Sequence, residues 1–333
     1  MEHALMLIVG QERDPAVDID HDRRVAVLTF SANGEYLFSG STRGVQMWRV
    51  EDGKQMARMH TTSKTEWDCD VISLAVSKDG RWIAAGTDDR RMFVWEANTC
   101  EEVYSQDWGR FYCVDFSPDS TRLVYGSHEV FVWDIATRKQ VQTLLHHHGY
   151  GGYIVAAKYS PQGDRIATSN RDSIRVWDSD DGRLLVEIDT QVIPYSNDGF
   201  RRCNDCLFVV SSSKIEQIIT STGLTISQWQ VPDVGQGSCI ALPEHGDFIA
   251  YFSGWGAGVT LWDTSTHTQL SIVPHPGYIH SIALSPDGRF LAIEYKDTND
   301  FNDKGWKIAI KNLSRMAVSI HLIRLRWHLS NSL

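Results

Sequence analysis

Several features that are common in other classes of protein are scarce in this sequence. No apolar run among its 333 residues approaches the roughly 18 that a membrane-spanning helix requires, so we expect no membrane partner. The amino-terminal stretch MEHALMLIVG has an acidic residue and a histidine where a secretory signal has lysine or arginine. The six cysteines are thinly spread, as is typical of reduced thiols in a cytosol. These absences predict a cytoplasmic protein, with a nuclear location left open.

Positive charge and catalytic motifs are also scarce. The net charge of −10 disfavours sequence-independent binding of nucleic acid, which depends on lysine and arginine contacts to phosphates. The chain has no GxxxxGK phosphate loop, no GxSxG nucleophile turn and no HExxH zinc pair. The histidine run at 146–148 is better explained as a solvated loop, and the acidic stretches at 178–182 and 297–303 as polar hairpins. The single CxxC at 203–206 is better explained as buried or idle thiols. We therefore expect no enzymatic activity, no cofactor, no metal site and no nucleic-acid partner.

Tryptophan, in contrast, is abundant and regularly placed. Half of the twelve tryptophans end a short alternating run of apolar and polar residues: Trp48, Trp95, Trp133, Trp177, Trp229 and Trp262. A further run, KIAIKN, has Lys311 where the tryptophan would stand. The steps between these seven positions are 47, 38, 44, 52, 33 and 49 residues. A period of about 40 to 45 residues is typical of four-stranded propeller blades.

Each period repeats the same order of local patterns. An apolar strand ends at a serine-led turn, as in SLAVSKDG, and a second strand ends in small residues, as in WIAAG. The strand that ends at tryptophan comes next, and a polar turn then leads to a weaker fourth strand. Four strands alone leave apolar faces exposed, so neighbouring blades must pack against one another around a ring. The sequence thus predicts an all-β propeller of four-stranded antiparallel blades, with the six tryptophans as anchors between blades.

At this point the chain resembles the WD-repeat family, from about Val25 to Lys311. The dipeptides that carry the resemblance are Trp133-Asp134, Trp177-Asp178 and Trp262-Asp263. It implies seven blades, some of them degenerate, and an aspartate before the third strand that bonds to an upstream histidine. Asp89 matches that aspartate, and Asp172 matches it nearly. The serine- and proline-punctuated blades are also similar to propeller regions attached to NACHT-type NTPases in fungi, which serve as sensors or scaffolds.

We expect one propeller domain over residues 1–313 and a tail over 314–333 that is either an outer strand or disordered. The expected blades cover about 20–60, 67–106, 110–146, 153–189, 203–233, 236–274 and 278–313. The fifth blade departs furthest from the pattern, with three strands that end at Trp229 and an outermost strand that is expected to be missing. Either residues 3–9 or residues 317–323 close the ring, and the usual latch of the resembled family favours the amino-terminal segment.

The expected site is the propeller face formed by the loops from fourth to first strands and from second to third strands. At that face the residues no longer serve the core. The candidates for partner binding are Arg24, Trp67, Asp70, Asp88, Trp108, Arg110, Tyr153, Arg171 and Tyr278. Tryptophan, tyrosine and arginine dominate hot spots on protein interfaces. Packing between blades is an equally strong explanation for each tyrosine and tryptophan taken singly.

Three functions remain to be weighed. The first is a non-catalytic scaffold that binds a protein or peptide partner and is compatible with a larger multidomain or multisubunit assembly. The second is a reader of phosphorylated or acidic motifs through Arg24, Arg110 and Arg171. The third is an enzyme with a carboxylate or metal cluster on the propeller axis, for which the first strands offer mainly Asp115 and Lys158. The first is the prediction, and the other two are its alternatives.

Overall fold

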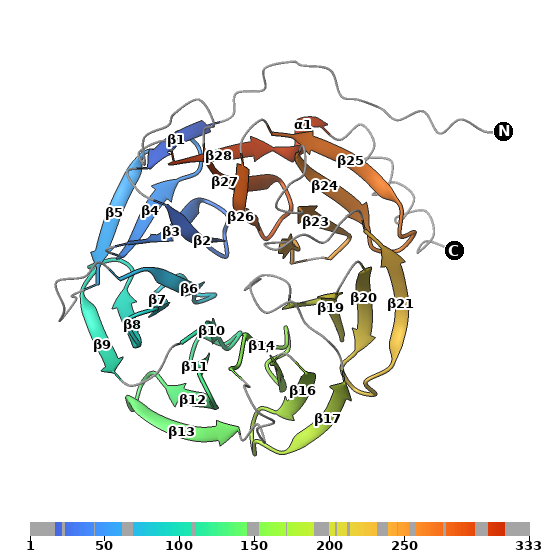
Figure 1. The fold of residues 1–333 in the computed structure, drawn as a ribbon. Coiled ribbons are helices and arrows are strands. Elements are labelled where there is room, and N and C mark those ends of the chain that lie inside the picture. The colour runs from blue at the N-terminus through green and yellow to red at the C-terminus, as the bar shows by residue number, and fades with distance from the viewer. Residues whose placement is uncertain are drawn as a thin grey trace.

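The computed structural model is a ring of seven four-stranded antiparallel sheets, which confirms the predicted seven-bladed β-propeller (Figure 1). No helix among the described residues is both long and apolar enough to cross a membrane. The structure describes residues 17–21, 24–42, 44–61, 69–107, 111–144, 153–170, 172–189, 200–203, 205–211, 214–231, 239–244, 246–252, 258–275, 278–296 and 306–316.

The first three blades follow the chain in order, and the first strand of each lies nearest the axis (Figure 1). Blade 1 consists of β2 (Val25–Phe30), β3 (Tyr36–Ser41), β4 (Gly44–Arg49) and β5 (Gln55–His60). Blade 2 consists of β6 (Val71–Val76), β7 (Trp82–Thr87), β8 (Arg91–Glu96) and β9 (Glu102–Asp107). Blade 3 consists of β10 (Cys113–Phe116), β11 (Arg122–Gly126), β12 (Val130–Asp134) and β13 (Lys139–Leu144).

The next three blades have the same internal order. Blade 4 consists of β14 (Ala156–Tyr159), β15 (Arg165–Ser169), β16 (Ser173–Asp178) and β17 (Leu184–Asp189). Blade 5 consists of β18 (Phe200–Cys203), β19 (Cys206–Ser211), β20 (Lys214–Ile219) and β21 (Thr225–Gln230). Blade 6 consists of β22 (Cys239–Ala241), β23 (Phe248–Phe252), β24 (Gly258–Asp263) and β25 (Gln269–Pro274).

Blade 7 closes the ring with strands from both ends of the chain. Its inner strands are β26 (Tyr278–Leu284), β27 (Phe290–Lys296) and β28 (Trp306–Asn312), and its outer strand is β1 (Val17–His21). The closing strand therefore comes from the amino-terminal side, as expected, but it is not the proposed segment 3–9, which lies outside the described residues. The alternative in which the tail supplies the outer strand is wrong, because β1 occupies that position against β28. The first tail residues belong to the short helix α1 (Leu313–Met316).

Serine-led turns join the first and second strands of five blades in the described part of the chain. In blade 2, Ser77 Oγ donates to Asp79 Oδ1 (2.6 Å) and accepts the backbone N–H of Trp82 (2.8 Å). The same pair of bonds recurs at Ser31, Ser117, Ser160 and Ser285. The turn in blade 2 requires a positive φ at Gly80 (72°), which glycine adopts without steric cost. The sequence pattern therefore closes these hairpins by a recurring side-chain bond.

The buried core is divided into seven apolar clusters, each shared by two neighbouring blades. Trp95 of blade 2, for example, packs against Phe38 and Val45 of blade 1 and is 1% exposed. Trp48, Trp133 and Trp177 lie in the corresponding clusters between blades 7 and 1, 2 and 3, and 3 and 4. Burying such a large side chain contributes roughly 3 kcal/mol. Each of these tryptophans therefore packs between its own blade and the preceding one.

The anchor position also has a backbone signature. The pairing of third and fourth strands shifts register immediately before Trp48, Trp95, Trp133, Trp177 and Trp262. In blade 5 the same shift precedes Ile218, which is buried and belongs to the cluster between blades 4 and 5. Ile218 therefore occupies the anchor position of blade 5.

Two expectations about blade 5 are wrong. Trp229 lies on the outermost strand, β21, and packs in the cluster between blades 5 and 6, not against the preceding blade. The outermost strand is also present, because the unrecognised strand β18 supplies the innermost position and moves every later strand outward by one place. A four-residue strand with the polar sequence FRRC gives little apolar signal, which explains the error.

Candidate functional site

The channel has two different mouths, because the first strand of every blade runs along it from one face to the other. We call one mouth the loop face; it is formed by the connections from fourth to first strands and from second to third strands. The opposite mouth, formed by the turns from first to second strands, is called the turn face. The sequence predicts a binding site on the loop face.

Of the nine predicted partner-binding residues, the structure describes Arg24, Asp70, Asp88, Tyr153 and Tyr278. All five stand at the starts of first strands or in a second-to-third turn, as the sequence predicts for the loop face. Trp67, Trp108, Arg110 and Arg171 lie outside the described residues, so their roles stay predictions.

Asp70 and Asp88 stabilise the loops of blades 1 and 2. Asp70 accepts the hydroxyl of Thr42 from blade 1 (2.5 Å), and its own backbone N–H donates to Asp88 Oδ1 (2.9 Å). The backbone N–H of Asp88 in turn donates to the Asp70 carbonyl (3.0 Å). These bonds give both carboxylates a structural role at the loop face.

Tyr153 lies in an aromatic cluster at the loop face of blades 3 and 4. Its ring contacts His128 at 4.5 Å and Tyr112 at 5.3 Å between centroids, the second edge to face. Tyr153 is 41% exposed, and His128 is exposed as well. Tyr112 also lines the channel. The cluster therefore presents aromatic surface to solvent beside the channel mouth, where a partner could cover it.

Tyr278 belongs to a second cluster, at the seam between blades 7 and 1. Its ring contacts His280 (4.6 Å), which contacts Trp306 (4.9 Å), and Lys296 Nζ lies 5.4 Å from the Trp306 centroid. Burial lowers the pKa of His280 to about 4, and the positive charges of Arg24 and Lys296 act in the same direction. The imidazole is therefore neutral at physiological pH.

Glu294 lies beneath this second cluster and was not singled out by the sequence. It is 0% exposed, and among the described residues no group forms a hydrogen bond of 3.5 Å or less with either carboxylate oxygen. Burial raises the pKa of Glu294 well above its usual value, although Arg24 and the backbone N–H of Val25 oppose the rise. Burial therefore favours the neutral form of this carboxyl group. In the sequence, Glu294 is a single acidic residue within the apolar strand FLAIEYK, and nothing in that pattern indicates that its side chain is buried.

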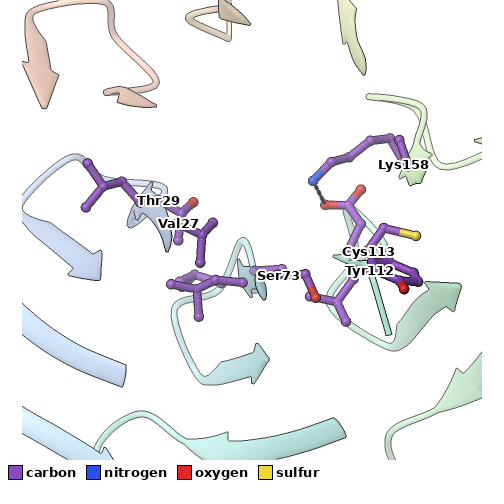
Figure 2. Close-up of a pocket in the computed structure, with 13 residues that line it drawn as sticks. Val27, Thr29, Ser73, Tyr112, Cys113 and Lys158 are labelled. Carbon is purple, nitrogen blue, oxygen red and sulfur yellow. Dashed lines mark hydrogen bonds and ion pairs between the residues drawn. The ribbon is translucent and has the colours of Figure 1, made fainter. Parts of the chain in front are cut away.

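A cavity of about 190 Å³ lies in the channel among the first strands of blades 1 to 4. Its two charged side chains bind each other, since Lys158 Nζ lies 3.2 Å from Asp115 Oδ1 (Figure 2). Asp115 Oδ2 also accepts the backbone N–H of Tyr159 (2.9 Å). The sequence placed both residues on first strands, and the structure pairs them. Within the described residues, no group of three or more His, Cys, Asp or Glu side chains could hold a metal ion.

The turn face carries a larger hollow, of about 300 Å³, that the sequence did not indicate as a site. Six blades contribute to its wall, which includes Phe116, Leu242 and the turn prolines Pro118, Pro161 and Pro286. Lys78 of blade 2 and Glu244 of blade 6 form an ion pair at 2.9 Å across non-neighbouring blades. The sequence identifies these prolines as turn residues. It does not show that closure of the ring brings them together on one face.

Comparison with known proteins agrees with the repeats. The family model described as "WD domain, G-beta repeat" matches residues 59–96 and 138–178, which contain the anchors Trp95 and Trp177. Two segments of the chain therefore match the WD40 repeat. Within the propeller, these segments include the third strands of blades 2 and 4.

Similar proteins match this propeller over only part of their length. Periodic tryptophan protein 2 of Arabidopsis thaliana is 28% identical over 51% of this chain and 19% of its own length. Transcription initiation factor TFIID subunit 5 of Caenorhabditis elegans is 25% identical over 54% of this chain and 28% of its own length. The β-propeller domain of Myceliophteria thermophila Cps50 (Swd1) superposes with a TM-score of 0.72 at 16% identity, over 88% of this chain and 97% of that domain. The matched half of this chain thus covers less than a third of either relative, and the structural likeness concerns the fold.

Proposed function

We propose that this WD40 propeller is a non-catalytic scaffold that binds a protein or peptide partner at its loop face. The observation that carries the proposal is the exposed aromatic cluster of Tyr153, Tyr112 and His128 beside the channel mouth. Exposed tyrosine on a rigid framework supplies contact area at low entropic cost. One of the similar proteins is named as a subunit of TFIID, which supports a role in an assembly.

The geometry of the channel favours the scaffold over an enzyme. A catalytic acid or base needs an available proton site with a suitable pKa. In the channel, Asp115 and Lys158 bind each other, and Asp115 is also bonded to the backbone. Because each partner satisfies the other, neither is poised to react with a substrate.

Capture of binding partners from cell extract tests the proposal. The intact chain should retain a set of proteins that Tyr153→Ala loses, because the substitution removes an exposed ring of the cluster. Val141→Ala is the matched control, since Val141 is 48% exposed but lies on β13 at the rim of blade 3. If Tyr153→Ala and Val141→Ala retain the same proteins as the intact chain, the loop face of blades 3 and 4 is not the binding surface.

Two finer hypotheses stay predictions. A reader of phosphorylated or acidic motifs through Arg24, Arg110 and Arg171 would bind in a strongly salt-dependent way, whereas an aromatic platform would not. The similarity to propellers of fungal NACHT-type proteins would be supported by an NTPase region in the same reading frame. A cytoplasmic location is likewise a proposal that imaging of the tagged protein would test.

A further inference from the structure

The hollow on the turn face combines an apolar wall with an exposed ion pair whose members can exchange partners. Phe30, Phe116, Leu242 and Leu284 line it together with the three prolines. The Lys78 and Glu244 side chains are 56% and 55% exposed, although they join blades on different sides of the ring. An ion pair with this much exposure contributes little to stability, typically below about 1 kcal/mol. Its partners can therefore be replaced without loss of the fold.

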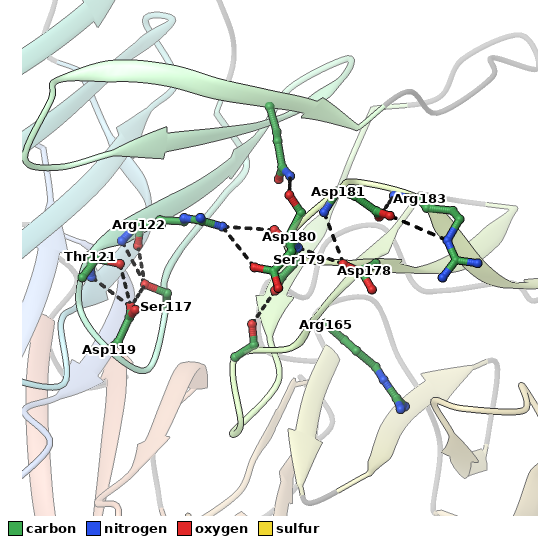
Figure 3. A network of polar contacts seen from close by, with 12 residues as sticks. Ser117, Asp119, Thr121, Arg122, Arg165, Asp178, Ser179, Asp180, Asp181 and Arg183 are labelled. Atoms are coloured by element: carbon green, nitrogen blue, oxygen red, sulfur yellow. Dashed lines mark hydrogen bonds and ion pairs between the residues drawn. The ribbon is translucent and has the colours of Figure 1, made fainter.

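The charge around the hollow is predominantly negative. Among the residues that line it, Lys78 is accompanied by two carboxylates, Glu244 and Asp115. Next to the lining residues, the serine-led turns add three more carboxylates, at Asp79, Asp119 and Asp287. Partial burial opposes ionisation of Asp119, but hydrogen bonds from Ser117 and Thr121 lower its pKa overall (Figure 3). Asp115 is paired with Lys158 and Asp287 lies 3.8 Å from Arg289, so Glu244, Asp79 and Asp119 carry the remaining negative charge.

The nearby arginines do not cancel this charge inside the hollow. Arg81 forms an ion pair with Glu96 on β8 (3.3 Å) and lies over the ring of Trp82, so it is directed along its own blade. Arg289 is 3.8 Å from Asp287 and lies over Phe290, and neither arginine lines the hollow. Among the described residues that line the hollow, Lys78 is thus the cation that pairs with Glu244.

We propose that the turn face binds an extended segment of a partner protein in which a lysine or arginine is flanked by apolar residues. The incoming cation takes the place of Lys78 beside Glu244, and the flanking apolar side chains cover Phe116, Leu242 and the turn prolines. Acidic side chains around an apolar wall select this chemistry, because an acidic segment would meet the carboxylates of Glu244, Asp79 and Asp119. The surface lies opposite the loop face, so it is independent of the proposed function there.

A displayed library of random dodecapeptides, selected on the intact chain, tests this inference. Enriched sequences should carry lysine or arginine between apolar residues, and the synthetic peptide of the strongest clone is then measured by fluorescence anisotropy. Glu244→Gln should weaken its binding about fivefold or more, since the charge partner is lost. Lys78→Ala should strengthen binding up to about fivefold, because the competing cation is removed.

Controls separate this surface from the loop face. Tyr153→Ala should leave the affinity of the peptide unchanged, and unchanged thermal midpoints of Lys78→Ala and Glu244→Gln would show that both variants fold. Binding should also weaken as sodium chloride is raised. The inference is overturned if no enriched peptide depends on Glu244, if enriched peptides are acidic, or if Lys78→Ala and Glu244→Gln change affinity in the same direction. Failure of the loop-face experiment alone would leave it standing.

Discussion

The interface between blades 3 and 4 and the seam between blades 7 and 1 are built around the same anchor. Trp177 is 5% exposed and donates its indole N–H to Thr168 Oγ1 (2.7 Å), and Trp48 is 6% exposed and donates to Ser39 Oγ (2.8 Å). Each hydroxyl lies on the second strand of the same blade as its tryptophan. At both interfaces the repeat therefore buries the indole in the same way, with its N–H bonded to a hydroxyl of the second strand.

The two interfaces differ in where their charged and titratable side chains lie. Between blades 3 and 4, Arg122 donates to the Ser179 carbonyl (3.2 Å) and approaches Asp180 (3.9 Å), with side chains 35% and 90% exposed (Figure 3). At the seam, Glu294 is fully buried, two residues from Ala292 in the shared apolar cluster, and His21 is 2% exposed against Trp48 and Ser39.

The difference follows from how the ring closes. The ordinary interface is formed by consecutive segments, and its charged side chains are paired: Arg122 with Asp180 at the margin, and Asp115 with Lys158 in the channel. At the seam, β1 from one end of the chain pairs with β28 from the other, and His21 of β1 packs against Trp48 of blade 1. Glu294 of blade 7 lies near Arg24 and Val25 at the start of blade 1. The pairing of β1 with β28 also lacks the register shift found beside the anchors of other blades. We infer that ionisation acts on the stability of this propeller mainly at the seam.

The largest expected effect tests what the two interfaces share. Trp177→Ala and Trp48→Ala should each reduce the free energy of unfolding by roughly 3 to 5 kcal/mol, because each leaves a large cavity between blades. Urea-induced unfolding followed by far-ultraviolet circular dichroism would measure both. Similar losses are expected despite the different surroundings. A loss below about 1 kcal/mol in either variant would contradict the role of that tryptophan as an anchor.

A smaller difference should separate the interfaces at the turns that contact the preceding outer strand. Gly53 and Gly182 both have positive φ, at 67° and 72°. A Cβ at Gly53 would collide with Val17 of the closing strand, whereas one at Gly182 would lie 3.1 Å from the mobile end of Leu144. Gly182→Ala should therefore cost about 1 kcal/mol for backbone strain, and Gly53→Ala about 2 to 4 kcal/mol.

Thermal unfolding of the two glycine variants measures this difference. Replacing Gly80 by alanine is the control for the backbone, since its φ is 72° and no atom lies within 4 Å of the added Cβ. Equal losses for Gly53→Ala and Gly80→Ala would show that the closing strand yields to the extra atom, and that the seam is looser than its packing indicates.

The architecture could be predicted from the sequence because its signals are local. The alternating run before Trp95 and the serine-led turn at Ser77 each lie within a few residues, and they recur in most blades. Blade 5 shows where this fails. The steps of 52 and 33 residues around Trp229 marked the irregularity, yet a buried isoleucine at 218 fills the anchor position, and isoleucine in a strand carries no distinguishing signal.

The candidate sites were less accessible, because they depend on contacts between distant segments. The sequence assigned Asp115 and Lys158 to first strands but gave no sign that they bind each other. Lys78 and Glu244 are 166 residues apart, and their contact follows only once seven blades have closed into a ring. The burial of Glu294 depends in the same way on Arg24 and Val25 of another blade.

The subtlest difference between the interfaces is their response to pH. A carboxyl group whose pKa is higher in the folded protein stabilises it fully below the usual pKa of about 4.5, and that contribution is lost as pH rises toward the folded value. Wild-type protein should therefore lose stability as pH rises above about 4.5 relative to Glu294→Gln, whose amide does not titrate. Each unit of pKa shift corresponds to about 1.4 kcal/mol. Urea midpoints of both proteins across this range give the difference.

The other titratable groups at the seam set the control. His280, with its lowered pKa, acts in the opposite sense, because stability is lost as pH falls from about 6.5 toward 4. Both proteins contain His280, so the difference between their free energies of unfolding cancels its contribution and leaves that of Glu294.

Asp178→Asn, at an exposed turn of blade 4, is the control for the other interface. Its stability should show no such pH dependence relative to wild type over the same range, since hydrogen bonds from the backbone N–H groups of Asp180 and Asp181 lower the pKa of Asp178. If the difference in stability between wild type and Glu294→Gln does not change with pH, the seam tolerates the ionised carboxylate. The seam and the interface of blades 3 and 4 would then differ only in their packing.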